Sequence, residues 1–146
     1  MEIRKVEFSE INGVLDLIDQ YERKKSPRPS ESITREIYNS LELSGGCVFG
    51  AFNYNKIIGT CTVNICPNYS WSGRSYAIIE NVIVSKAYRN NGIGKLLLLS
   101  AKSYAEQKNC YKVALMTASK EEKVLKFYQS AGFEGNKIGY QIRFQA

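Results

Sequence analysis

Apolar residues follow two spacings along this chain. In six segments they alternate with polar residues or form short β-branched runs, a pattern typical of strands. In four others they recur every third or fourth residue, as on one side of an amphipathic helix. The pattern predicts strands at residues 3–8, 47–52, 57–65, 76–84, 111–117 and 138–144. It predicts helices from Ser9, as N-cap, to Tyr21, around residues 33–41, and at residues 95–107 and 120–130.

The order of these elements predicts the fold class. Three strands that can pair antiparallel precede a strand–helix–strand unit. We therefore expect an α/β fold (α+β mixed) with a mixed, mostly antiparallel central sheet and helices on both faces. The sheet would have six strands, or seven if a short strand follows Gly132. A length of 146 residues is that of one domain, covering residues 1–146.

Composition narrows the chemistry. The chain contains no histidine, which excludes Ser-His-Asp triads, Cys-His pairs and His-ligated metals. Its four cysteines have the spacing of neither a metal knuckle nor a redox pair, so we expect buried free thiols and no metal. The first residues lack the apolar core of a signal peptide, and no apolar run approaches the roughly 20 residues of a membrane span. We therefore expect a cytoplasmic protein.

The basic residues gather in the second half of the chain. The net charge is +6, and residues 74–146 carry 12 basic and 5 acidic side chains. A basic segment of this kind attracts anionic partners such as nucleic acid, a membrane surface or a phosphorylated small molecule. No dense Lys/Arg face or recognition motif marks a nucleic-acid binder. We expect a small-molecule partner, with no nucleic acid and no membrane.

The turn that follows the strand at residues 76–84 is the strongest local signal. Backbone N–H groups between Arg89 and Lys95 can converge where a helix begins, and the helix N-terminus adds partial positive charge. Gly92 and Gly94 have no Cβ and would allow close approach of a phosphate. The glycine patterns of dinucleotide-binding and Walker loops are absent at this turn. The turn is therefore an anion site suited to a diphosphate.

Three motifs occur in a fixed order around this turn. Residues 89–94 read Arg-Asn-Asn-Gly-Ile-Gly, an apolar strand precedes them, and residues 127–133 read F-Y-x-x-x-G-F. Together they resemble the GNAT superfamily of acyl-CoA-dependent N-acyltransferases, whose motif is R-x-x-G-x-G/A. Segment 79–133 is similar to glucosamine-6-phosphate and aminoalkylphosphonate N-acetyltransferases. The resemblance implies the GNAT fold with splayed fourth and fifth strands, acetyl-CoA (CoA) as co-substrate and, as in many small members, a homodimer.

The same resemblance implies roles for particular residues. Amides of the turn would hold the CoA diphosphate, and the end of the preceding strand would pair with the pantetheine arm. Glu80 matches a general base of several members, and Tyr128 matches a general acid beside the thioester sulfur. Glu121 stands where many members have an Asn that reaches toward pantetheine, which leaves that contact open. The implied cofactor-binding residues are Val82, Ile83, Val84, Arg89, Asn90, Asn91, Gly92, Ile93, Gly94 and Lys95.

Chemical reasoning from the residues alone leaves both catalytic and structural roles open for them. Acetyl transfer to an amine needs a proton acceptor for the ammonium, a donor to the carbonyl oxygen and an acid for the leaving thiolate. Glu80, a lone carboxylate in an apolar strand, could accept the proton directly or through a water, pair with a Lys or Arg, or face solvent. Tyr128 could be the acid, or it could pack under the sheet with Phe127. The amide of Ile83 or Val84 is the expected donor.

The acceptor site is expected between residues 26–36, the loop at 67–76 and the last two strands. An aromatic pocket there would suit an alkylamine or a small aromatic amine. The candidate walls are Tyr69, Trp71, Tyr76 and Tyr140. The basic side chains that could bind a phosphate or carboxylate, or simply be surface charges, are Arg28, Arg74 and Arg143.

Three functions compete. The first is an acetyl-CoA-dependent N-acetyltransferase that acts on the primary amine of a small molecule by direct attack in a ternary complex. No cysteine near the motif has the basic neighbour or helix N-terminus that an activated thiolate needs, which disfavours an acyl-enzyme. The second is a protein or peptide N-acetyltransferase, which would need a peptide groove. The third is a non-catalytic CoA-binding regulatory module, which would need neither Glu80 nor Tyr128; their joint presence favours an enzyme.

Overall fold

The computed structural model describes residues 1–20 and 26–144. Tyr21, the expected end of the first helix, lies outside this range. The strands are β1 (Glu2–Lys5), β2 (Cys47–Asn53), β3 (Lys56–Cys66), β4 (Tyr76–Val84) and β5 (Val113–Leu115). The α-helices are α1 (Ile11–Asp19), α2 (Glu31–Leu43), α3 (Ser70–Gly73), α4 (Ile93–Gln107) and α5 (Glu122–Ser130). Two short 3-10 helices are η1 (Phe8–Glu10) and η2 (Lys86–Tyr88).

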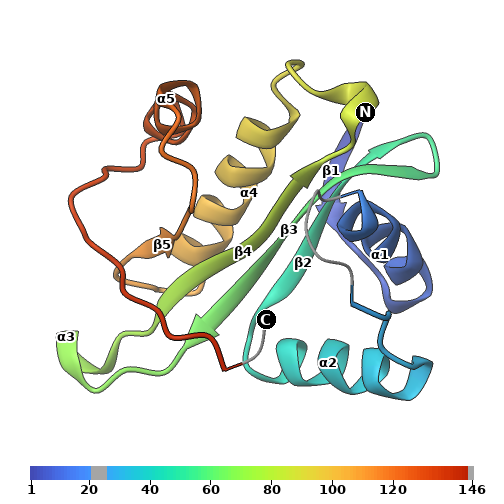
Figure 1. Ribbon diagram of the computed structural model, residues 1–146. Helices are drawn as coiled ribbons and strands as arrows, with labels where there is room; N and C mark the ends of the chain where they lie inside the picture. Colours follow the sequence, from blue (N-terminus) through green and yellow to red (C-terminus); the bar gives the residue numbers. More distant parts are fainter. Residues whose placement is uncertain (21–25, 145–146) are drawn as a thin grey trace.

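A single mixed sheet lies at the centre of the molecule, with the strands in the order β1-β2-β3-β4-β5 (Figure 1). The first three strand pairs are antiparallel. The last pair, β4 with β5, is parallel, as a strand–helix–strand crossover through α4 requires. The predicted fold class, a mixed and mostly antiparallel sheet, is confirmed.

The predicted number of strands is wrong for the part of the chain that the structure describes. The sheet has five strands rather than six or seven, because neither residues 138–144 nor the residues just after Gly132 form one. The strand expected at 111–117 is also shorter, Val113–Leu115. A strand exists only where its backbone groups pair with a neighbour, and alternation alone supplies no neighbour.

Helices cover both faces of the sheet, as expected (Figure 1). On one face, Val14 and Leu17 of α1 pack in a buried cluster with Ile83 of β4. On the other face, Leu97 and Leu98 of α4 are completely buried in the larger cluster. β4 therefore runs between the two cores, which places the site described below at the centre of the fold.

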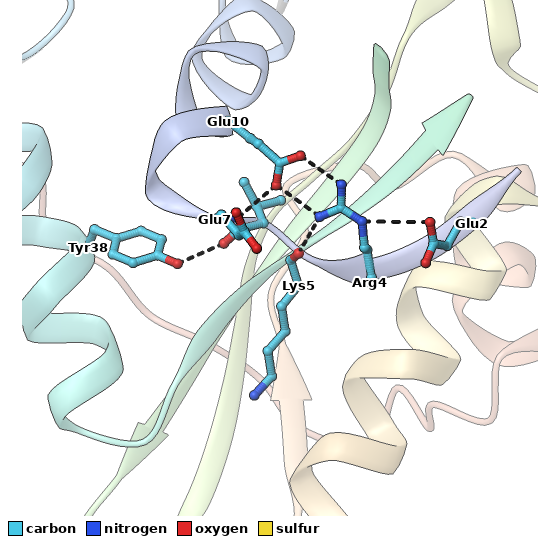
Figure 2. Close-up of polar contacts among 7 residues, drawn as sticks. Glu2, Arg4, Lys5, Glu7, Glu10 and Tyr38 are labelled. Carbon is cyan, nitrogen blue, oxygen red and sulfur yellow. Dashed lines mark hydrogen bonds and ion pairs between the residues drawn. The ribbon is translucent and has the colours of Figure 1, made fainter. Parts of the chain in front are cut away.

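The entry into α1 differs from the prediction. Ser9 is not the N-cap; it lies within η1, and the Glu10 carboxylate accepts the Glu7 amide at 2.9 Å. Arg4 of β1 donates to both oxygens of the same carboxylate at 2.9 and 2.7 Å, as Figure 2 shows. These bonds lower the pKa of Glu10 to about 2. The ion pair thus fastens the first strand to the first helix.

Candidate active site

β4 and β5 separate after three paired positions. Residues 77–79 pair with residues 113–115, and no further pair between these strands follows in the described chain. On its other edge β4 stays paired with β3 as far as Val84, which lies opposite Gly59. The edge of β4 that faces β5 is therefore open beyond Ile79. The predicted splay of these two strands is confirmed.

A bulge bends β4 where the strands separate. Asn81 and Val82 together lie opposite one residue of β3, Cys61. Asn81 has φ of 54°, in the left-handed region that Asn tolerates better than most residues. Ile79 before the bulge and Val82, its second residue, both pack in the core on the α4 face, so the bulge resets the alternation of the strand. An Asn inside an apolar strand is the sequence signal that could have located this bulge.

A cavity of about 190 Å³ occupies the opening between the two strands. This is below the roughly 300–1,000 Å³ of a typical small-molecule pocket, so it suits a small reacting group rather than a whole ligand. Sequence reasoning missed its β5 side, because loop residues after a strand carry no pattern of their own. The lining residues are Ile79, Glu80, Asn81, Val82, Ile83, Leu115, Met116, Thr117, Ala118 and Tyr128.

The structure brings the two predicted catalytic side chains, Glu80 and Tyr128, to the same cavity. Glu80 is exposed, as in the alternative in which it faces solvent, and no ion pair among the described residues involves it. Tyr128 is half-buried, with its ring against Phe127 at 5.0 Å and Phe133 at 6.5 Å. Tyr128 therefore packs against Phe127 and Phe133 and also lines the cavity.

Backbone amides also face the opening. The Ser85 amide donates to the Ile58 carbonyl of β3 at 2.8 Å. Because amides of successive strand residues point to opposite edges, the Ile83 amide faces β3 and the Val84 amide faces the open edge. Of the two backbone amides expected to act as donors, only the Val84 amide points toward the open edge. The Val82 amide points in the same direction.

The turn into α4 has the conformation expected of an anion site. Asn90 and Gly92 both have positive φ, 65° and 76°, and Gly92 is the N-cap. The first intrahelical amide is that of Leu96, which donates to the Gly92 carbonyl at 3.1 Å, so the amides of residues 93–95 have no acceptor one turn back. A Cβ on Gly92 would meet nothing within 4 Å, so the space over the turn is open. The turn thus fits a diphosphate.

Two side chains stabilise this turn through hydrogen bonds to backbone carbonyls. The Arg89 guanidinium donates through Nε to the Val84 carbonyl at 3.2 Å, and Asn91 donates to the Tyr88 carbonyl at 3.2 Å. Arg89 therefore joins the turn to the end of β4, a role that the expectation of a cation beside the phosphates did not include. Lys95 is exposed on the first turn of α4.

Comparison with known proteins identifies the family. The model of the GNAT acetyltransferase family matches residues 11–133. The chain belongs to the GNAT acetyltransferase family. It is an N-acetyltransferase, and its family uses acetyl-CoA.

Individual relatives are similar over nearly the whole acetyltransferase chain. Glucosamine 6-phosphate N-acetyltransferase of Trypanosoma brucei brucei is 29% identical over 94% of this chain and 91% of that protein. The structure of a putative acetyltransferase from Agrobacterium tumefaciens is 31% identical, with a TM-score of 0.88 over 98% of this chain and 99% of that one. Glucosamine-6-phosphate N-acetyltransferase from Arabidopsis thaliana, 23% identical with a TM-score of 0.86 over 99% and 98%, shares the fold.

The aromatic residues expected to form the acceptor wall of the acetyltransferase do not line the cavity. Trp71 stacks on Tyr111 with ring centroids 5.1 Å apart, and Tyr76 meets the edge of the same ring at 6.3 Å. Both lie at the opposite end of β4 from the turn. Tyr140 is 92% exposed and belongs to no strand.

Two of the expected phosphate-binding arginines have other partners. Arg28 pairs with Asp16 and Asp19 of α1 at 2.6 and 2.7 Å. Arg74 donates to the carbonyls of Asn109 and Cys110, which ties the loop before β4 to the loop before β5. These two side chains are therefore structural in the acetyltransferase as described.

The cysteines of the acetyltransferase are all free, and three are buried. Burial raises the pKa of Cys47 to about 11 and of Cys61 to about 12, and it raises the pKa of Cys110. These thiols stay protonated at neutral pH and are poor nucleophiles. Within the described residues, no helix is long and apolar enough to cross a membrane, and no cluster of acidic or cysteine side chains could hold a metal ion.

Proposed function

We propose that this acetyltransferase moves the acetyl group of acetyl-CoA to the primary amine of a small molecule by direct attack. One observation carries the proposal: the split between β4 and β5 holds a carboxylate, a phenol and outward-facing amides around one small cavity, and β4 leads directly into the turn at α4. The protonated state of the buried cysteines favours direct attack over a thioester on the enzyme.

The chain offers two surfaces for acetyl-CoA, which supplies an acetyl group already activated as a thioester. Amides of residues 90–95 at the start of α4 would hold its diphosphate. The open edge of β4 at Val82 and Val84 would pair with the amide groups of the pantetheine arm, as an added strand does. Gly92 keeps the approach to the turn clear.

Each group at the cavity has a task that suits its chemistry. Glu80 would take the proton from the acceptor ammonium, directly or through a water, because a carboxylate at the cavity mouth can reach both the amine and solvent. The Val84 amide would donate to the carbonyl oxygen as it gains charge. Tyr128 would donate the proton that the departing sulfur needs.

The acceptor is proposed to be an amino sugar, with an amino-sugar phosphate as the first compound to test. Two relatives, from Trypanosoma brucei brucei and Drosophila melanogaster, carry the names glucosamine 6-phosphate N-acetyltransferase and probable glucosamine 6-phosphate N-acetyltransferase. The excess of basic residues in 74–146 supports an anionic acceptor. Of the arginines considered for its phosphate, Arg143 is exposed and has no ion-pair partner among the described residues.

The test is an amine screen with acetyl-CoA, in which release of free thiol is measured. Glucosamine 6-phosphate, glucosamine, aminoalkylphosphonates, polyamines, aminoglycosides and a set of peptides form the panel. We expect turnover with an amino sugar phosphate and none with peptides. Turnover with peptides alone would replace the small molecule by a protein acceptor. Binding of acetyl-CoA without turnover of any amine would indicate a regulatory module instead.

A further inference from the structure

A second and larger cavity lies between α1 and the hairpin that joins β2 to β3, and we call it the α1 groove. Its volume of about 820 Å³ is within the roughly 300–1,000 Å³ of small-molecule sites. Two of its residues, Leu17 and Ile57, belong to the buried cluster beneath α1. The α1 groove shares no lining residue with the cavity at Glu80 and Tyr128, so it is a separate candidate site.

Ser85 gives the α1 groove an unused hydroxyl group. This residue directly follows β4, lines the groove and is only 7% exposed. Its backbone groups are bonded, but its side chain caps nothing and forms no hydrogen bond among the described residues. In the same part of the chain, no side-chain oxygen or nitrogen that is closed off from solvent lacks a partner, so the Ser85 hydroxyl opens into the groove. A ligand that bonds to it would satisfy a nearly buried polar group.

The charged side chains at the α1 groove leave one cation without a counter-ion. Glu10 accepts two bonds from Arg4, and Asp16 pairs with Arg28 at 2.6 Å. Lys56 is exposed and has no ion pair or cation–π contact among the described residues. The groove therefore favours an anionic ligand over a cationic one.

Amide side chains supply most of the remaining polar lining. They come from Asn12 and Gln20 on α1 and from Asn53 and Asn55 at the hairpin. A carboxamide both donates and accepts hydrogen bonds, which suits ligand hydroxyl groups because these also do both. A small molecule with several hydroxyl groups and one acidic group matches this lining, and a sugar phosphate is of that class.

The α1 groove also contacts η2, which joins β4 to the turn before α4. The Lys86 amide donates to Oε1 of Gln20, a lining residue, at 3.2 Å. The Tyr88 amide donates to the Ser85 carbonyl at 2.9 Å, and the Tyr88 carbonyl accepts a bond from Asn91 of the turn at 3.2 Å. A ligand bond to the unused Ser85 hydroxyl breaks none of these contacts, so it adds a restraint to η2.

We propose that the α1 groove is a second ligand site that binds a sugar phosphate, with Lys56 at the phosphate and the Ser85 hydroxyl at a sugar hydroxyl. Because the bound ligand restrains η2, less ordering is left to the turn when it binds a diphosphate, so the two ligands favour each other's binding. This cooperativity rests on the proposed function. The site itself does not, since no residue of its lining has a part in acetyl transfer.

The first test is calorimetry with glucose 6-phosphate, which has no amine and cannot be acetylated. Ser85→Ala and Lys56→Gln should each weaken its binding about three- to tenfold, as expected for the loss of one hydrogen bond. Ser103→Ala and Lys102→Gln make the same changes at exposed positions of α4 and should leave the Kd unchanged. Absence of binding, or equal weakening by the controls, would overturn the site. Binding of spermidine in place of glucose 6-phosphate would overturn the preference for an anion.

The second test locates the bound ligand by nuclear magnetic resonance. Glucose 6-phosphate should shift the side-chain amide signals of Asn12 and Asn53 and the backbone amide signal of Ser85. The signals of Thr117 and Ala118, at the other cavity, should stay in place. Shifts confined to those two residues would place the ligand in the acetyl-transfer cavity and overturn the groove as its site.

The third test measures the cooperativity. Saturating glucose 6-phosphate should slow hydrogen exchange of the Tyr88 amide and lower the Kd of acetyl-CoA about threefold, and Ser85→Ala should abolish both effects. An unchanged Kd with the α1 groove occupied would overturn the cooperativity. A groove that binds glucose 6-phosphate in a protein that does not bind acetyl-CoA would reject the proposed function alone.

Discussion

A Cβ atom on Gly94 would lie 2.9 Å from Cζ of Phe127, closer than packed atoms tolerate. The two residues join the first turn of α4 to α5, and the residue that follows Phe127 is Tyr128. The close contact between α4 and α5 leaves no room for a Cβ at position 94, which explains the glycine. This contact adds a packing role to the expectation that Gly94, like Gly92, admits a phosphate. The contact links the turn at the start of α4 to the helix that carries the phenol at the cavity.

Substitution of Gly94 by Ala should therefore lower the stability of the fold. The added methyl group overpacks the contact with Phe127 and should cost about 1–3 kcal/mol of unfolding free energy. Gly135→Ala, where a Cβ meets nothing within 4 Å, is the control and should be near neutral. Chemical denaturation measures both. Addition of Phe127→Leu to Gly94→Ala should recover part of the loss, and no recovery would argue against the contact as its cause.

A side chain at Gly92 should be unfavourable for a different reason. Its φ of 76° disfavours any L-residue, so Gly92→Ala should cost about 1 kcal/mol. Gly132, with φ of 95° and equally open surroundings, provides the control for this backbone penalty. By calorimetry, Gly92→Trp should weaken acetyl-CoA binding about tenfold or more, which is about 1.4 kcal/mol. Gly132→Trp should leave the affinity unchanged. Equal affinities of the two Trp variants for acetyl-CoA would show that this turn does not bind the diphosphate.

Tyr128→Phe removes a hydroxyl and retains the ring that packs on Phe127 and Phe133. If the hydroxyl protonates the leaving sulfur, kcat should fall about 100-fold while the Kd of acetyl-CoA stays close to wild type. Tyr54→Phe, at a position that is 94% exposed, is the matched control. Steady-state kinetics and calorimetry separate the two quantities. An unaltered kcat would leave Tyr128 with packing alone.

Glu80→Gln should lower kcat about 100-fold at neutral pH, because the amide cannot take the proton of the acceptor ammonium. It should also flatten the rise of the rate with pH. Glu106→Gln on α4, where the carboxylate is exposed and pairs with Lys102, tests for a general effect of lost charge. The pH–rate profiles of the two variants decide the matter. Superimposable profiles for Glu80→Gln and the wild type would mean that another base acts.

The Arg4–Glu10 pair in Figure 2 predicts the acid sensitivity of the fold. The pKa of Glu10 is lowered from 4.5 to about 2, chiefly by the hydrogen bond from Arg4. A lowered pKa stabilises the folded state above pH 4.5, and this contribution is lost as the pH falls toward 2. Glu10→Gln should lower the unfolding free energy at pH 7 by about 0.5–1 kcal/mol, since the pair is partly exposed and screened.

The same variant should reduce the acid dependence. Urea titrations at pH 7, 4.5 and 2.5 should show a smaller loss of stability between the last two for Glu10→Gln than for the wild type. Glu2→Gln removes the weaker partner of Arg4, at 3.7 Å, and should change this slope little. Parallel slopes for wild type and Glu10→Gln would contradict the lowered pKa.

Local patterns predicted the elements where local forces dominate. The strand at 76–84 agrees residue for residue with β4, since nine mostly β-branched or apolar residues have few alternatives. Asn90 adopts φ of 65° because Asn tolerates the left-handed region better than most residues, and this preference is a property of the residue itself. Ser9 was wrong as an N-cap because Glu10, fastened by Arg4, competes for the same turn, and that competition involves a different strand.

By itself the sequence determined the mixed, mostly antiparallel fold class, and it singled out the turn before α4 and the pair Glu80 and Tyr128 as candidates, because spacing and residue type suffice for each. Only the tertiary structure decided that these two side chains share a cavity, that Asn81 bends β4, and that Gly94 serves helix packing. It also decided that Arg28 and Arg74 are engaged elsewhere and that the backbone of residues 138–144 has no hydrogen-bond partner among the described residues. Such outcomes depend on which distant segments meet, and a linear pattern carries no information about a neighbour that lies far away along the chain.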